Sequence, residues 1–291
     1  MAGLAYSIVT PVWNEEENLP RLAACIERQW RAPDAWVIVD TGSTDSTARV
    51  ASELGERHEW VRTVVLESGD VARGGPIVRA FAAGLSELGD DLPDVIVKLD
   101  ADLDFDADYF ESLVGAFERD PKLGIASGLC YERSGEEWRA EYGTRSHVWG
   151  ASRAYRRECL QDVLPLEERQ GWDEIDAIKA RLHGWTVGTL FDVPFRHLRA
   201  EGSRDGGRQR WLDQGDTARY MGYRFSYLLA RAVYKARRDP AALAMVWGYS
   251  RAALTREPVL PDPEARKYLR RTQRLRELPV RAREALGKTD G

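Results

Sequence analysis

Two aspartates that follow a short apolar run are the residues best placed to do chemistry. The run spans residues 95–99, and Asp100 and Asp102 come directly after it. Its β-branched residues and the preceding Pro93 predict a buried strand. Residues at i and i+2 of an extended chain point to the same side, so both carboxylates converge past the end of the strand. Two hard oxygen ligands in this position suit Mg²⁺ or Mn²⁺ bound to the phosphates of a substrate.

Two other interpretations of these aspartates are open. An acidic surface turn is common and has the same residues. A calcium-binding loop is the second, because the acids between Asp100 and Glu111 fall near the ligand positions of an EF-hand. That loop needs glycine at its sixth position, where Phe105 stands, and it is entered from a helix rather than from a strand.

Composition bounds the class of protein. The chain has 291 residues and is 43% hydrophobic, which suits one large α/β domain with extensions or two small domains. Its three cysteines contain no C-x-x-C pair, which argues against a disulfide framework and a zinc site. We therefore expect a reducing, cytoplasmic compartment. We also expect no signal peptide and no membrane-spanning helix, which would need about 20 apolar residues.

Charge is distributed unevenly along the chain. Residues 219–291 hold 17 Lys+Arg against 7 Asp+Glu, or +10, so residues 1–218 hold 25 against 40, or −15. A basic appendage on an acidic domain indicates contact with an anionic membrane surface, on the inner face of the membrane. A solvated helical hairpin explains the same charges equally well. No recognised nucleic-acid-binding module accompanies them, so nucleic acid is not an expected partner.

Strands and helices alternate over the first 120 or so residues. The predicted strands cover residues 6–9, 35–40, 61–66 and 95–99. The predicted helices begin at Asn14, at Ser43 or Thr44, at Pro76 and at about Asp106. This alternation predicts an α/β fold with a Rossmann-like, mostly parallel, doubly wound sheet. Polar residues follow three of the strands at one edge, which indicates a site rather than a single acidic turn.

Three ordered motifs closely resemble the family 2 glycosyltransferases of the GT-A fold. They are IVTPVWNEEENL at 8–19, VDTGSTDST at 39–47 and DAD at 100–102. The resemblance covers roughly residues 5–200, and the D-x-D region is similar to that of dolichol-phosphate-mannose-synthase-like members. It implies an inverting sugar transfer from a nucleotide-diphospho-sugar of the UDP or GDP type, with Mg²⁺ or Mn²⁺. The implied acceptor is a glycan, a lipid-linked molecule or a small molecule.

The resemblance also assigns roles to residues of the donor side. The first strand end would form the wall of the nucleobase pocket, and a carboxylate at position 40 would bind the base. Trp13 fits a core position equally well. The implied donor-binding set is Thr10, Pro11, Trp13, Glu15, Asp40, Ser43, Arg73, Arg79, Asp100, Ala101 and Asp102. The implied metal ligands are Asp102, Asp100 and His197.

The resemblance further implies an acceptor side and a general base. Trp149, Gly150 and Trp172 would line the acceptor side, where Arg156 and Arg157 could meet an anionic acceptor. The family places the base in an acidic pair eleven residues before a Gly-aromatic turn, which in this chain is Asp173. Trp172 replaces the usual glutamate, so Glu174 stays open as the alternative base. Acids that cap a helix N-terminus are the other interpretation of this pair.

We expect two parts in the chain. Residues 1–215 would form the catalytic domain, with a nucleotide-binding half (1–122) and an acceptor half (123–215). Residues 216–291 would form a basic helical extension. Residues 207–211 (GRQRW) resemble a broken form of the signature of processive synthases, so we expect one sugar per encounter. The alternatives are a sugar nucleotidyltransferase, or a non-enzymatic module that binds calcium or a lipid surface.

Overall fold

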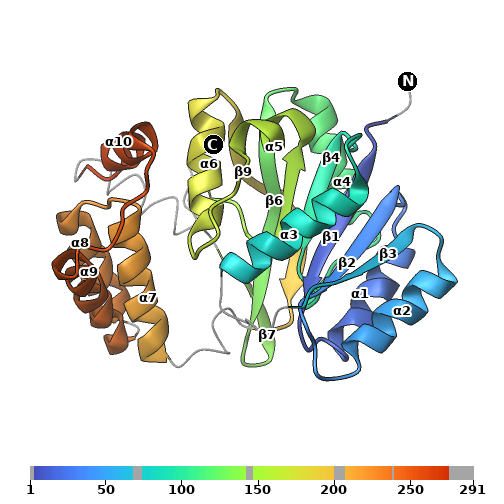
Figure 1. The fold of residues 1–291 in the computed structure, drawn as a ribbon, viewed down its shortest axis with the longest axis horizontal. Helices are drawn as coiled ribbons and strands as arrows, with labels where there is room; N and C mark the ends of the chain where they lie inside the picture. Colours follow the sequence, from blue (N-terminus) through green and yellow to red (C-terminus); the bar gives the residue numbers. More distant parts are fainter. Residues whose placement is uncertain (1–2, 68–73, 142–146, 200–206, 238, 275–291) are drawn as a thin grey trace. The chain divides into compact units, whose positions relative to one another are not determined.

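The computed structural model describes residues 3–67, 74–141, 147–199, 207–237 and 239–274 (Figure 1). The chain divides into two compact units, Met1–Arg199 and Ala200–Gly291. The boundary that we expected after residue 215 would fall inside helix α7 (Gly207–Tyr220), which belongs to the second unit.

A mixed sheet forms the centre of the first unit. In the described part of the chain its order is β3-β2-β1-β4-β8-β6-β9-β5, with β7 paired to β6. The strands are β1 (Tyr6–Val12), β2 (Ala35–Asp40), β3 (Val61–Val65), β4 (Val95–Leu99), β5 (Leu103–Asp104), β6 (Leu123–Ser134), β7 (Glu137–Ala140), β8 (Ser152–Arg156) and β9 (Thr186–His197). Strands β1 to β4 are parallel, as expected, whereas β8 runs antiparallel to both β4 and β6.

Helices cover both faces of this sheet (Figure 1). They are α1 (Asn18–Glu27), α2 (Thr47–Arg57), α3 (Gly75–Leu88), α4 (Tyr109–Arg119), α5 (Arg157–Val163) and α6 (Trp172–Leu182). Helices α1, α2 and α4 pack in one hydrophobic core with Ile8, and α3, α5 and α6 pack in the other with Val9. Neighbouring residues of one strand thus serve opposite faces, as the pleat requires. The predicted doubly wound α/β arrangement is confirmed.

The first two helices begin later than expected. Helix α1 begins at Asn18 instead of Asn14, and α2 begins at Thr47. Asn14 has a positive φ of 53°, and its side-chain oxygen accepts a hydrogen bond from the amide of Thr44 at 2.8 Å. The residues that we expected to cap these helices connect two turns instead.

The second unit, hereafter the helical unit, consists of packed helices. They are α7, α8 (Phe225–Ala236), the 3₁₀ turn η1 (Pro240–Leu243), α9 (Ala244–Leu254) and α10 (Pro263–Thr272). Helices α7 and α9 approach so closely that a Cβ on Gly215 would lie 2.1 Å from the carbonyl oxygen of Met245. Gly222, with a φ of 77°, separates α7 from α8. Among the residues described, no helix is both long and apolar enough to span a membrane.

Candidate active site

The turns after β1 and β2 are hydrogen-bonded to each other. The amide of Asn14 donates to the hydroxyl of Ser43 at 3.0 Å, and the amide of Glu15 donates to the hydroxyl of Thr47 at 2.7 Å. Asp40 is buried and accepts from both the amide and the hydroxyl of Ser43, at 2.9 and 2.7 Å. The structure therefore brings Glu15, Asp40 and Ser43 together at one edge of the sheet.

Other residues of the expected donor-binding set have different surroundings. Thr10 is fully buried, and its hydroxyl accepts a hydrogen bond from the indole of Trp36 at 2.9 Å. Its side chain therefore supports this edge from inside the sheet. Pro11 and Trp13 are half-buried at the end of β1, and Ala101 is buried just after β4.

The expected donor-binding set also includes two arginines, Arg73 and Arg79. Arg73 lies outside the described residues. Arg79 lies on α3, 3.3 Å from a carboxylate oxygen of Glu168. A Cβ on Gly74, which has a φ of 91°, would lie 2.2 Å from the amide nitrogen of Gln170. The segment before α6 thus packs tightly against the start of α3.

Asp102 lies between two cationic side chains. One of its oxygens is 3.4 Å from Nε2 of His197, and the other is 3.4 Å from Nε of Arg199. The same arginine also pairs with Glu15, which is itself buried. The structure thus brings Asp102 and His197 together and adds Arg199, which we did not predict. The signal was present, because Arg199 follows His197 by the same i, i+2 spacing that links the two aspartates.

The electrostatics of this pair follow from its contacts. Burial alone would raise the pKa of Asp102, but the hydrogen bond from His197 and the charges of His197 and Arg199 hold that pKa below its usual value. Burial would lower the pKa of His197, but hydrogen bonds to Asp102, Cys130 and Glu132 raise it to about 12. Both groups are therefore charged at neutral pH.

Asp102 and His197 also fit a divalent metal ion. Neighbouring ligand atoms of an octahedral ion with bonds of about 2.1 Å lie about 3 Å apart, and the two side chains here are separated by 3.4 Å. The carboxylate oxygen is the kind of ligand that Mn²⁺ favours, and the imidazole would be a further ligand once it has lost its proton.

Lys98 connects Asp100 to the residues that we expected on the acceptor side. Its side chain is almost fully buried on β4, and its ammonium donates to Asp100 and, at 2.9 Å, to the carbonyl of Gly150. The ammonium also lies 5.9 Å from the ring centre of Trp172. Burial raises the pKa of Asp100, and the nearby ammonium opposes that rise. The ammonium of Lys98 is thus a cationic partner of Asp100 within the protein.

Gly150 in turn lies beside the expected base. A Cβ on Gly150 would lie 3.4 Å from Oδ2 of Asp173 and 3.8 Å from the ring of Trp172. Asp173 is half-buried, whereas Glu174 is exposed on α6. The indole N–H of Trp149 is buried and finds no hydrogen-bond acceptor within the described ranges. The structure therefore gathers Trp149, Gly150, Trp172 and Asp173 into one group.

A buried arginine holds the start of α6. The guanidinium of Arg153 is fully buried and pairs with Asp176. It also donates to the carbonyls of Val148 and Asp173, at 2.9 and 2.7 Å, and lies 5.7 Å from the ring centre of Trp172. Two buried cations, Lys98 and Arg153, therefore contact the ring of Trp172. We predicted neither of them.

Some basic residues that we considered for an anionic acceptor lie elsewhere. Arg156 pairs in register with Val95, at the start of β4, and donates to backbone carbonyls. Arg157 donates to the carbonyl of Leu92 and to Asp94. Both are therefore at the edge of the sheet opposite Asp100.

A doubly wound sheet with a D-x-D turn at one edge fits the resemblance of the sequence motifs to the family 2 glycosyltransferases. The model of the family described as Glycosyl transferase family 2 matches residues 7–166. An uncharacterized glycosyltransferase of Mycobacterium tuberculosis is 31% identical over 233 residues, which cover 72% of this chain and 91% of that relative. The chain therefore belongs to glycosyl transferase family 2, and it is a glycosyltransferase. The nucleotidyltransferase and non-enzymatic alternatives are set aside.

Two further proteins are informative. An undecaprenyl-phosphate 4-deoxy-4-formamido-L-arabinose transferase of Pseudomonas aeruginosa is 29% identical over 182 residues, which cover 56% of this chain but only 50% of that relative. A mannosyltransferase of Pyrobaculum calidifontis, solved with GDP-Man and Mn²⁺, covers 100% of this chain and 89% of its own, with 18% identity and a TM-score of 0.58. This likeness confirms the predicted GT-A fold.

Proposed function

We propose that the enzyme is an inverting, metal-dependent glycosyltransferase that moves one sugar per encounter from a nucleoside-diphosphate sugar to an acceptor oxygen. One observation carries this proposal. Lys98 binds both Asp100, in the D-x-D turn, and Gly150, which lies against Asp173. Asp100, the carboxylate on the donor side, and Asp173, the carboxylate that would act as the base, thus belong to one connected cluster. A single transfer step needs both substrates next to each other.

On the donor side, Asp40 and the turns around it would hold the nucleoside. Asp102 and His197 would hold the metal, which when bound acts as a Lewis acid on the departing diphosphate. Arg199, which pairs with Asp102 and Glu15 in the free enzyme, would exchange these carboxylates for phosphate oxygens. The mannosyltransferase neighbour with GDP-Man and Mn²⁺ supports a donor and a cofactor of this kind.

On the acceptor side, Asp173 would take the proton of an attacking hydroxyl. Inversion requires that hydroxyl to approach the anomeric carbon opposite the departing diphosphate, so the base has to lie across the sugar from the metal. Among the residues that the structure describes, the indole N–H of Trp149 has no acceptor, so a sugar or acceptor oxygen would be its partner. A phosphate acceptor is already ionised and needs no base. The undecaprenyl-phosphate transferase relative supports a lipid phosphate as one acceptor class.

A panel of nucleotide-sugars, screened by thermal unfolding with and without Mn²⁺, tests the donor assignment. A ligand that binds only the folded state raises the melting temperature, so we expect a rise that needs both the correct donor and the metal. Asp102→Asn should lose the part of the melting-temperature rise that depends on Mn²⁺. Asp106→Asn is the matched control, because Asp106 is largely exposed and its carboxylate lies 3.9 Å from Arg196. Equal rises with and without Mn²⁺ would contradict metal dependence.

A further inference from the structure

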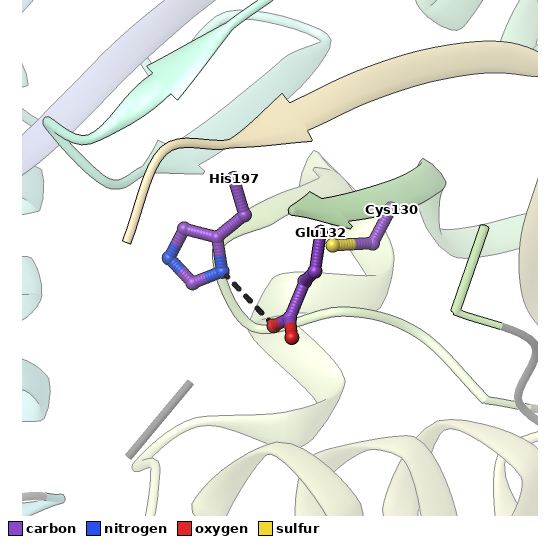
Figure 2. A group of neighbouring side chains, drawn as sticks. All are labelled: Cys130, Glu132 and His197. Atoms are coloured by element: carbon purple, nitrogen blue, oxygen red, sulfur yellow. Dashed lines mark ion pairs between the residues drawn. The ribbon is translucent and has the colours of Figure 1, made fainter. Parts of the chain in front are cut away.

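Cys130, Glu132 and His197 form a cluster on one face of the sheet (Figure 2). Cys130 and Glu132 are two residues apart on β6, and Glu132 pairs in register with His197 on β9. The pleat therefore places all three side chains on the same side. Cys130 is buried, and the other two are partly exposed, so solvent can reach the cluster.

The spacing of the three donor atoms suits a tetrahedral metal ion. The sulfur, the ring nitrogen and the carboxylate oxygen all lie within 4.8 Å of one another. Around Zn²⁺, with bonds of about 2.0–2.3 Å, ligand atoms lie roughly 3.3–3.8 Å apart. Nδ1 of His197 is already 3.7 Å from the nearer oxygen of Glu132. Closing the cluster therefore needs only small side-chain rotations.

The chemistry of these donors selects a different metal from the D-x-D site. A thiolate with an imidazole and a carboxylate suits Zn²⁺ or Co²⁺, whereas Mg²⁺ and Mn²⁺ favour oxygen ligands. The other ring nitrogen supports this assignment. Nε2 of His197 lies 3.4 Å from Asp102, and a metal-bound histidine usually donates its second N–H to a carboxylate. With a metal at Nδ1, Asp102 is in place to accept that hydrogen bond.

We propose that Cys130, Glu132 and Nδ1 of His197 form a second metal site that takes Zn²⁺. A neutral imidazole has a single lone-pair nitrogen and one N–H, so it binds one metal at a time. Occupation at Nδ1 therefore excludes a metal at Nε2, and Zn²⁺ inhibits the Mn²⁺-dependent reaction. This exclusion rests on the proposed function, whereas the site itself does not. No sequence pattern announces the site, because its ligands come from two strands far apart in the chain.

Cobalt titration of the full-length protein tests the site directly. Co²⁺ bound to a thiolate has a charge-transfer absorption band, which we expect for the wild type and to be weaker for Glu132→Gln. Cys130→Ser should abolish the band. Cys159→Ser is the matched control, because Cys159 is equally buried but lies on α5. A band that survives in Cys130→Ser, or one that is lost in Cys159→Ser, overturns the site.

Competition tests the exclusion. Donor binding in the presence of Mn²⁺ is measured by calorimetry with and without added Zn²⁺. We expect Zn²⁺ to weaken donor binding in the wild type and to have no such effect in Cys130→Ser. If the cobalt band is present but added Zn²⁺ leaves donor binding unchanged, the proposed exclusion of Mn²⁺ by Zn²⁺ is wrong. If donor binding needs no Mn²⁺ at all, the proposed function fails, and the cobalt band still decides the site.

Discussion

Asp173 and Glu174 are adjacent acids in the first turn of α6, but they face different surroundings. Asp173 points toward Gly150, and Glu174 is exposed to solvent. We expect Asp173→Asn to lower turnover with a hydroxyl acceptor by ~100- to 10,000-fold, since a general base contributes about that much. Donor affinity should change little, because a base acts mainly in the transition state. Transfer rates and donor calorimetry measure the two effects separately.

Glu174→Gln is the control for this comparison, because it removes the neighbouring charge from the same helical turn. A rate that collapses in Glu174→Gln while Asp173→Asn stays near wild type would move the base by one residue. Small and equal losses in both variants would leave the acids as helix caps. With a phosphate acceptor we expect only a modest effect of Asp173→Asn, because that oxygen carries no proton to remove.

We predicted some residues of the candidate site from the sequence and not others, and there is one physical reason for the difference. Asp100, Asp102 and Asp173 stand beside strand ends or helix starts, where local patterns are informative. Lys98 and Arg153 lie within buried strands, and their partners come from distant segments. A charged residue inside an apolar strand is almost never buried without a partner. That rule could have flagged Lys98, but no local pattern identifies the carbonyl of Gly150 as its acceptor.

At the scale of elements, Arg153 anchors the start of α6 to β8. Removing one partner of a buried ion pair costs about 3–5 kcal/mol, because the other charge is left unpaired. We therefore expect Arg153→Met to lower the free energy of unfolding by about that amount. The double variant Arg153→Met/Asp176→Leu should recover part of this loss, since both buried charges are gone, but the buried hydroxyl of Tyr155 then loses Asp176 as its acceptor. Denaturant unfolding of the two variants measures the difference.

The transfer rate distinguishes positioning from stability. Arg153 also donates a hydrogen bond to the carbonyl of Asp173, and both variants lack this hydrogen bond. We expect turnover to stay low in the double variant even where its stability has recovered, with the Michaelis constant for the donor nearly unchanged. If stability and turnover recover together, Arg153 serves only the fold.

Element boundaries were harder to predict than the elements themselves. The turns after β1 and β2 bind each other through Asn14 and Thr44, so neither is free to cap a helix. In the same way, Gly207 and Gly215 look like helix breakers in the sequence. Gly215 is nevertheless inside α7, because only glycine allows the backbone of α9 to pass so closely. Tertiary contacts of this kind are invisible to local patterns.

At the scale of the whole molecule, charge and exposed apolar side chains coincide in the helical unit. Phe225, Leu229 and Val233 are exposed at i, i+4 and i+8 of α8, and residues 219–291 carry +10. An apolar stripe beside basic residues suits the surface of an anionic bilayer. We expect the protein to co-sediment with anionic vesicles, with up to ~1 kcal/mol for each basic residue that reaches the surface. Added salt should weaken the association.

The double variant Leu229→Glu/Val233→Glu should reduce this co-sedimentation strongly. Trp30→Glu is the matched control, since Trp30 is 76% exposed but lies in the first unit. Vesicle binding that does not change with added salt, or that Trp30→Glu reduces as much as the double variant does, would contradict a role for α8. The charge asymmetry of the sequence indicated a separate basic part, and the second compact unit of the structure spans Ala200–Gly291.

The position of Lys98 implies cooperativity between the two substrates. A donor that engages Asp100 competes for one partner of the buried ammonium, and the carbonyl of Gly150 then becomes its principal acceptor. Donor binding at Asp100 therefore changes the free energy of acceptor binding beside Gly150. Thermodynamic reciprocity requires the acceptor to change donor affinity by the same factor. We expect Lys98→Met to uncouple the two binding events, so that calorimetry finds the same donor affinity with and without acceptor.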